Sequence, residues 1–127
     1  MRASCVRPQY DLARDRGPAT LALLSFAPAC MYVTHYSRLT DVPRLADRVL
    51  SMLDAMVGLA QRLRDAPDRH ATLKRELTAL YAASLVEHGV ERVPEKVPLL
   101  AMDIELNAQG IGVWLDRQAK EQKEGTP

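Results

Sequence analysis

The sequence predicts an all-α fold: an antiparallel helical hairpin at residues 41–65 and 69–88, followed by one or two short C-terminal helices. An apolar side chain recurs every seven residues from Val42 to Leu63, which indicates a helix with one buried face. A second apolar stripe follows after a short link. The chain has only one Trp, one Phe and four Tyr, so its core must be aliphatic, which favours helices over a β-sandwich.

The first helix is expected to begin where its start signals stand. Thr40 or Asp41 can accept hydrogen bonds from the free N–H groups of the first turn, and Pro43 fits there because it has no N–H to satisfy. Apolar residues cover an arc of about 160° on this helix, which is wider than the seam of a two-stranded coiled coil. We therefore expect the helix to contact more than one neighbour.

The second helix also has signals at both ends. Pro67 cannot continue the first helix, and Asp68 is a suitable N-cap for the next one. Gly89 is expected to end this helix. Leu85 and Val90 stand where a Schellman motif places its apolar contact.

The C-terminal third is ambiguous between helices and strands. Residues 89–98 are expected to form a connector, extended before each of its two prolines. Large apolar residues then alternate with small or acidic ones over residues 100–106, which is a strand pattern and allows a β-hairpin at 99–115. In the helical interpretation, which we prefer, a first helix ends at Gly110 and a second follows it.

The first thirty residues differ from the rest. They contain both cysteines, none of the four lysines and repeated Pro and Gly interruptions. Their one apolar run precedes Cys30 and loosely resembles a secretory or lipoprotein signal. Two alternatives are that the protein starts at Met31, and that residues 1–30 are a genuine tail of the protein. We expect residues 1–30 to be a poorly ordered or non-native segment and residues 31–127 to be a single small helical domain.

Composition excludes several classes of partner. The formal net charge of +1 offers no electrostatic argument for binding nucleic acid or an anionic membrane. No stretch approaches the roughly 20 apolar residues of a membrane span. Two cysteines make neither a disulfide scaffold nor a metal knuckle. We therefore expect no cofactor, no metal and no membrane span.

Titratable residues give no catalytic constellation. His35, His70 and His88 lack the spacing of metal ligands. Asp103 and Glu105 are the nearest approach to a carboxylate pair, but on a helix they point in different directions and form the polar side of an amphipathic element. The sequence therefore predicts no catalytic residue and no enzyme.

The string around Asn107 and Gln109 is polar yet interleaved with large apolar residues. These two side chains could form a partner-binding or base-reading edge, although capping and turn roles are favoured. A helix-turn-helix at residues 99–122, with its turn at Gly110, is a related hypothesis. Asp116 and Glu121 on its second helix would repel phosphate, so nucleic-acid binding is not expected.

These features favour a small cytoplasmic protein that acts through helix-mediated protein–protein contact. We expect a homodimer that also binds a protein partner as an adaptor, inhibitor or anti-activator. The predicted interaction residues are apolar and lie mainly on the first helix: Val49, Met52, Leu53, Met56, Val57, Leu77 and Trp114. The plainer interpretation is that they are core. There are two alternative functions: a DNA-binding regulator that uses residues 99–122, and a periplasmic lipoprotein modified at Cys30.

Overall fold

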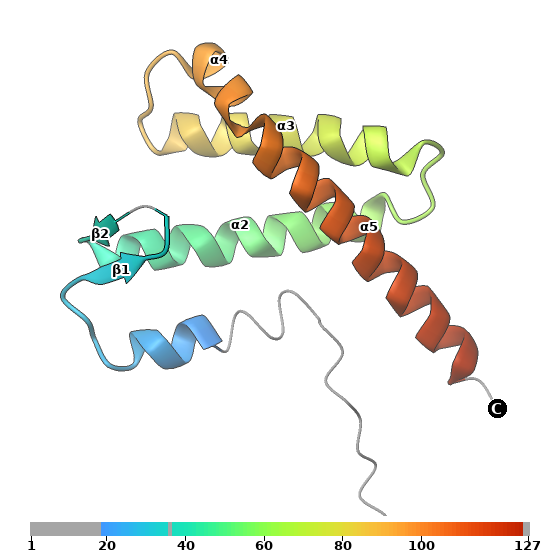
Figure 1. Cartoon of the computed structure of the whole chain (residues 1–127), viewed down its shortest axis with the longest axis horizontal. Helices are drawn as coiled ribbons and strands as arrows, with labels where there is room; N and C mark the ends of the chain where they lie inside the picture. Colours follow the sequence, from blue (N-terminus) through green and yellow to red (C-terminus); the bar gives the residue numbers. More distant parts are fainter. Residues whose placement is uncertain (1–18, 36, 126–127) are drawn as a thin grey trace, which may run out of the picture. The chain divides into compact units, whose positions relative to one another are not determined.

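The computed structural model describes residues 19–35 and 37–125 and is mostly helical, which confirms the predicted all-α class (Figure 1). The chain divides into two compact units, Met1–Asp54 and Ala55–Pro127. The division falls inside helix α2, Val42–Arg62, which contributes to both units. A predicted boundary after residue 30 stays a prediction, and residues 1–18 lie outside the described part of the chain.

The first unit contains a small sheet that the sequence did not predict. Residues 19–24, in the apolar run of the N-terminal segment, are helical. Strand β1, Met31–Val33, then pairs antiparallel with strand β2, Ser37–Leu39. The register sets Met31 against Leu39. Strands of three residues are too short to show an alternating pattern, so sequence periodicity could not reveal them.

Helix α2 begins as predicted, but its capping chemistry differs. The side chain of Asp41 accepts a hydrogen bond from Arg44 in the first turn. The predicted apolar face is buried near both ends of the helix, at Val42 and Ala46 in the first unit and at Leu59 and Ala60 in the second. The seven-residue repeat therefore identified the helix, although Val49 on the predicted face is 58% exposed.

Helix α3, Arg69–Glu87, has a correctly predicted end and a partly wrong beginning. Asp68 stands at the N-cap, but its backbone is left-handed (φ 51°) and its side chain makes no capping hydrogen bond. At the other end, Gly89 is left-handed (φ 78°), and the N–H of Val90 donates to the carbonyl of Leu85 at 3.0 Å. The N–H of Gly89 donates to Val86 at 2.9 Å, which completes the predicted Schellman motif.

The predicted extended connector is instead largely helical. It forms helix α4, Val93–Lys96, and the 3₁₀ helix η1, Val97–Leu100. Pro94 and Pro98 each lie in the first turn of one of these elements. A proline there loses no hydrogen bond, because first-turn N–H groups have no partner within the helix. This tolerance outweighs the preference for extended backbone before proline.

Helix α5, Ala101–Glu124, corrects the prediction for the C-terminal third. It is one helix of 24 residues, so neither the β-hairpin at 99–115 nor a pair of short helices divided at Gly110 exists. Gly110 costs about 1 kcal/mol of helix propensity. That cost is outweighed because buried apolar residues continue on one side of the helix before and after it, Ile104 and Ala108 on one flank and Ile111 on the other.

The core of the second unit lies where α5 crosses α3 (Figure 1). Leu73 and Leu77 of α3 are completely buried. Leu59 and Ala60 from the end of α2 belong to the same cluster. We call the residues that α5 contributes its inner stripe: Ile104, Ala108, Ile111, Trp114 and Leu115. The sequence paired α3 mainly with α2, whereas α5 is its most extensive neighbour.

We expect Leu77→Ala to lower the free energy of unfolding by about 2–5 kcal/mol, because Leu77 is fully buried and truncation leaves a cavity. Val86→Ala is the matched control on the same helix, since Val86 is 64% exposed, and should change it by less than about 0.5 kcal/mol. Urea unfolding followed by fluorescence of Trp114, the only tryptophan, measures both. Equal losses in the two variants would contradict this description of the core.

Candidate functional site

Helix α5 carries a second apolar stripe on the side facing away from the core. Met102, Leu106 and Val113 lie about 180° around the helix from the inner stripe. Leu99 in η1 continues this line toward the N-terminus. These four residues are 75%, 59%, 51% and 74% exposed, respectively. We call Leu99, Met102, Leu106 and Val113 the outer stripe.

The two stripes explain the misleading strand pattern. Leu100 and Ile104 pack in the core, whereas Met102 and Leu106 lie on the opposite side of the same helix. Residues two apart on a helix are about 200° apart, so alternating apolar residues place one set inside and the other outside. Such a helix is apolar on both faces while only one face is buried, which is unusual for a helix at a protein surface.

The predicted interaction residues divide into four groups. Leu77 and Trp114 are buried in the core, so they cannot form part of a free surface and the plain-core interpretation holds for them. Met56 and Val57 pack against that core and are partly buried. Only Val49, at 58%, is well exposed.

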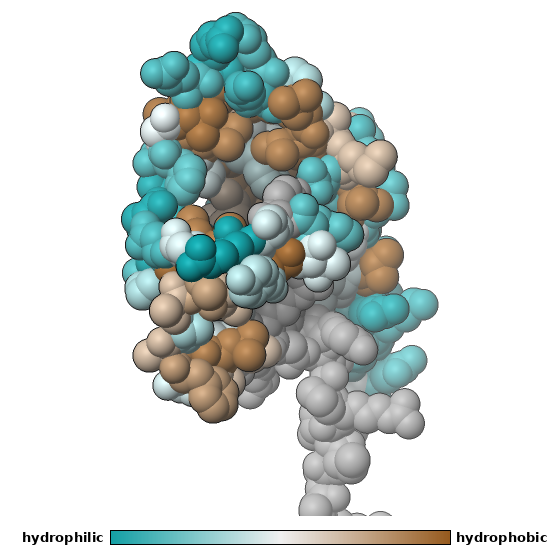
Figure 2. Space-filling view, turned by 60° about the vertical axis from the view of Figure 1, so that its left-hand side comes forward, coloured by the Kyte–Doolittle hydropathy of each residue, from teal (hydrophilic) through white to brown (hydrophobic). Residues whose placement is uncertain are grey.

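The remaining two, Met52 and Leu53, are partly exposed and belong to the first unit. The outer stripe was missed because its residues were considered as parts of a strand pattern and of a turn at Gly110. Its signal was nevertheless present in the sequence, as a spacing of three, four and seven residues from position 99 to position 113. Several apolar patches reach the surface that Figure 2 presents, separated by polar side chains.

Polar side chains join α3 to α5 beside the core. Lys74 Nζ lies 2.6 Å from Glu105 Oε2, and Glu105 Oε1 lies 3.0 Å from His70 Nε2. Gln109 Nε2 also donates to Glu105 Oε1 at 2.7 Å. The hydrogen bonds from Lys74 and Gln109, aided by the charges of Lys74 and His70, lower the pKa of Glu105 from 4.5 to about 2. Glu105 is therefore an ionised anchor between two helices.

The other polar candidates have similar structural roles. Asn107 Nδ2 donates to the hydroxyl of Tyr81 at 2.7 Å and so joins α5 to α3, whereas Gln109 bonds to Glu105 within α5. Both residues lie inside α5, so neither is a turn residue. Asp103 and Glu105 do not act as a carboxylate pair, because Asp103 is exposed on another side of α5 while Glu105 bonds to α3. Glu105, His70 and Lys74 thus join α5 to α3.

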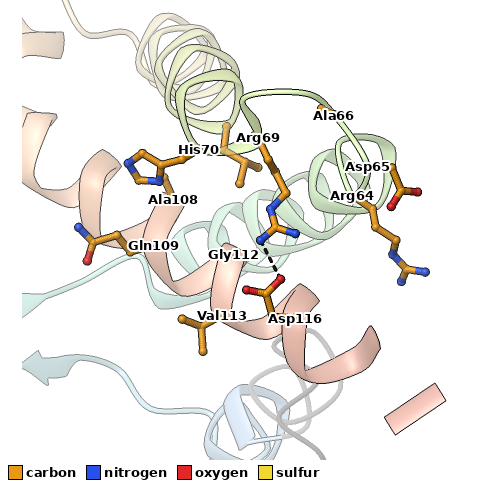
Figure 3. A pocket seen from close by; sticks show the side chains of 11 residues that line it. Arg64, Asp65, Ala66, Arg69, His70, Ala108, Gln109, Gly112, Val113 and Asp116 are labelled. Carbon is orange, nitrogen blue, oxygen red and sulfur yellow. Dashed lines mark hydrogen bonds and ion pairs between the residues drawn. The ribbon is translucent and has the colours of Figure 1, made fainter. Parts of the chain in front are cut away.

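An open pocket of about 700 Å³ lies where the link after α2 and the start of α3 face α5 (Figure 3). Across it, Arg69 Nη2 and Asp116 Oδ1 point toward each other and lie 2.8 Å apart. Arg64 Nη2 donates to Gln118 Oε1 at 3.1 Å. The buried Nε of Arg64 has no hydrogen-bond acceptor among the residues that the structure describes. The opposing charges of Arg69 and Asp116 therefore neutralise each other within the pocket.

Several features needed for other functions are absent from residues 19–35 and 37–125. Among these residues, no three His, Cys, Asp or Glu side chains gather as metal ligands. None of the helices described is both long and apolar enough to cross a membrane. The helix-turn-helix hypothesis required a turn at Gly110, where α5 is continuous. Cys30, the proposed lipoprotein residue, is a partly buried free thiol directly before β1.

Comparisons with protein-family models, with curated proteins and with solved structures found no match to this chain.

We expect Glu105→Gln to reduce the acid sensitivity of folding. Since the pKa of Glu105 is lowered on folding, its ionised form stabilises the protein above pH 4.5, and this stabilisation is lost as the pH falls toward about 2. The variant should therefore lose less unfolding free energy across that interval than the wild type. Urea titrations at a series of pH values measure this. Glu121→Gln, an exposed site on the same helix, should keep the wild-type dependence.

Proposed function

We propose that this protein is a helical binding module that acts by contact with another protein, and that the outer stripe of α5 is its contact surface. The observation that carries the proposal is the exposure of four large apolar side chains in one line along η1 and α5, while the other face of α5 is already buried. Contiguous apolar surface rimmed by polar residues is typical of protein-binding sites. Scattered single apolar residues would need no such explanation.

The energetics of the outer stripe support a specific contact. Burying one fully exposed Leu, Val or Met side chain contributes roughly 1.5–3 kcal/mol. The four residues of the outer stripe are each between half and three-quarters exposed, so covering them is worth several kcal/mol. Met102 adds an adaptable, unbranched side chain of the kind that recurs at binding surfaces. A partner helix with apolar residues at matching spacing would fit this line.

A rigid support also favours binding through α5. The inner stripe fixes α5 against α3, and the bonds of Glu105 to Lys74 and of Asn107 to Tyr81 hold the same region from the side. A preorganised helix loses little conformational entropy when a partner binds. Binding without chemistry suits an adaptor, an inhibitor or an anti-activator.

Site-specific photocrosslinking tests the proposal. A photoreactive phenylalanine analogue at position 106, in the full chain in its native host, should give a discrete covalent adduct with a protein that mass spectrometry identifies. The same analogue at position 86, which is exposed on α3 outside the outer stripe, should not give that adduct. Met102→Asp in the chain that carries the analogue at 106 should abolish the adduct, because a charge would be buried in the contact.

An adduct with a second copy of the chain and an adduct with a different protein both support binding through α5. Equal labelling from positions 86 and 106, or no adduct from position 106, would overturn the proposal.

A further inference from the structure

We propose that a second copy of this chain covers the outer stripe, with the two α5 helices antiparallel about a two-fold axis at Leu106. This inference rests on the proposed function, because it names the occupant of the same surface. A two-fold interface needs one surface that is complementary to itself. The spacing, the side-chain sizes and the charges of the outer stripe each meet that requirement.

The spacing is symmetric about Leu106. Leu99 and Val113 each lie seven residues from it, one on either side. In an antiparallel pair centred on Leu106, Leu99 of each copy therefore lies level with Val113 of the other. Leu106 meets its own equivalent on the axis. The stripe is about 21 Å long at 1.5 Å per residue, and this register covers the whole length in both copies.

The sizes of the facing residues also match. Met102 and Gly110 each lie four residues from Leu106, so Met102 of one copy lies level with Gly110 of the other. Gly110 is exposed, and a Cβ added to it would meet nothing within 4 Å in its own chain. Nothing within the described chain therefore requires glycine at this position in the helix. Against a second copy, its missing side chain leaves room for Met102.

The charges permit this register. Between residues 99 and 113 the charged side chains are Asp103 and Glu105, and Glu105 is already bound to Lys74 and His70. In the antiparallel pair, Asp103 lies level with Gln109 of the second copy. Like charges therefore do not face each other at the same level. A parallel pair would bring Asp103 level with its own equivalent, which is unfavourable.

The pair is expected to be concentration-dependent. Standard interfaces bury about 800 Å² on each partner, through some 20–30 residues. An interface built around four apolar side chains is smaller, so we expect association in the micromolar range. Because the pair is weak, it can dissociate and expose the outer stripe of each copy.

Disulfide trapping in the full chain tests the pair and its direction. Cys5 and Cys30 are first replaced by serine, and one new cysteine is then introduced into each variant. Leu106→Cys should form a disulfide-linked dimer in a glutathione redox buffer, because residues facing on the axis come within the 4.4–6.8 Å Cα distance that a disulfide allows. Leu99→Cys alone should stay monomeric, since its equivalent lies about 21 Å away. An equimolar mixture of Leu99→Cys and Val113→Cys should give the mixed dimer.

Any different outcome of this experiment overturns the inference. Linkage of Leu99→Cys with itself would show a parallel pair. Val86→Cys, exposed outside the outer stripe, measures random collision, and equal linkage at 86 and 106 would show that no specific pair forms. No linkage at 106 would show that a second copy does not cover the stripe in this register. An adduct with a different protein in the host would then leave the proposed function standing.

Sedimentation of the wild-type chain over a range of concentrations provides a second readout. Leu106→Asp should raise the dissociation constant of the dimer at least about tenfold, because a charge replaces the side chain on the axis. Val86→Asp is the matched control and should leave it unchanged. Circular dichroism should show the same helicity for both variants, as both sites are exposed. A wild-type chain that stays monomeric at high micromolar concentration would contradict the proposal.

Discussion

Burial of the inner stripe of α5 against α3 is the contact on which the second unit depends. It keeps α5 helical through Gly110, because the apolar side chains on both flanks of the glycine enter the same core. It also fixes which face of α5 remains outside. Once Ile104 and Ile111 point inward, the geometry of a helix places Met102 and Leu106 on the opposite side. The exposed surface is thus a consequence of the core, and not of a separate element.

The polar contacts strengthen this arrangement without creating a site for chemistry. Glu105 is ionised and held by two groups on α3, and Asn107 bonds to Tyr81 farther along the same interface. Because these bonds lie beside the core, they restrict rotation of α5 about its own axis. A rotation of α5 would break them and bury the outer stripe in place of the inner one. Their contribution to function is therefore to hold the outer stripe in position, which suits binding to a preorganised surface.

The exposed apolar surface lies on α5, whereas the sequence predicted it mainly on α2. The wide apolar arc on residues 42–63 predicts a binding surface that includes Val49, Met52 and Met56. Leu59 and Ala60 on the same helix are instead buried in the core of the second unit. Leu77 and Trp114 are also predicted interaction residues, and both are buried within one chain. Apolar periodicity measures how much of a helix prefers burial. It does not distinguish burial inside the chain from burial against a partner, because the same side chains serve both.

The sequence by itself determined the helical class, the positions of α2 and α3, and the Schellman ending at Gly89, because apolar spacing, prolines and glycines act over a few turns of the backbone. It did not determine the short β1–β2 hairpin, the helical connector or the continuity of α5. The alternation from Leu100 to Leu106 is compatible with a strand and with a helix, although the helix is preferred from the sequence. Only the tertiary structure decided between them, since burial of Ile104 against α3 is a contact between residues far apart in the chain. The same contact decided which apolar residues are left for a partner.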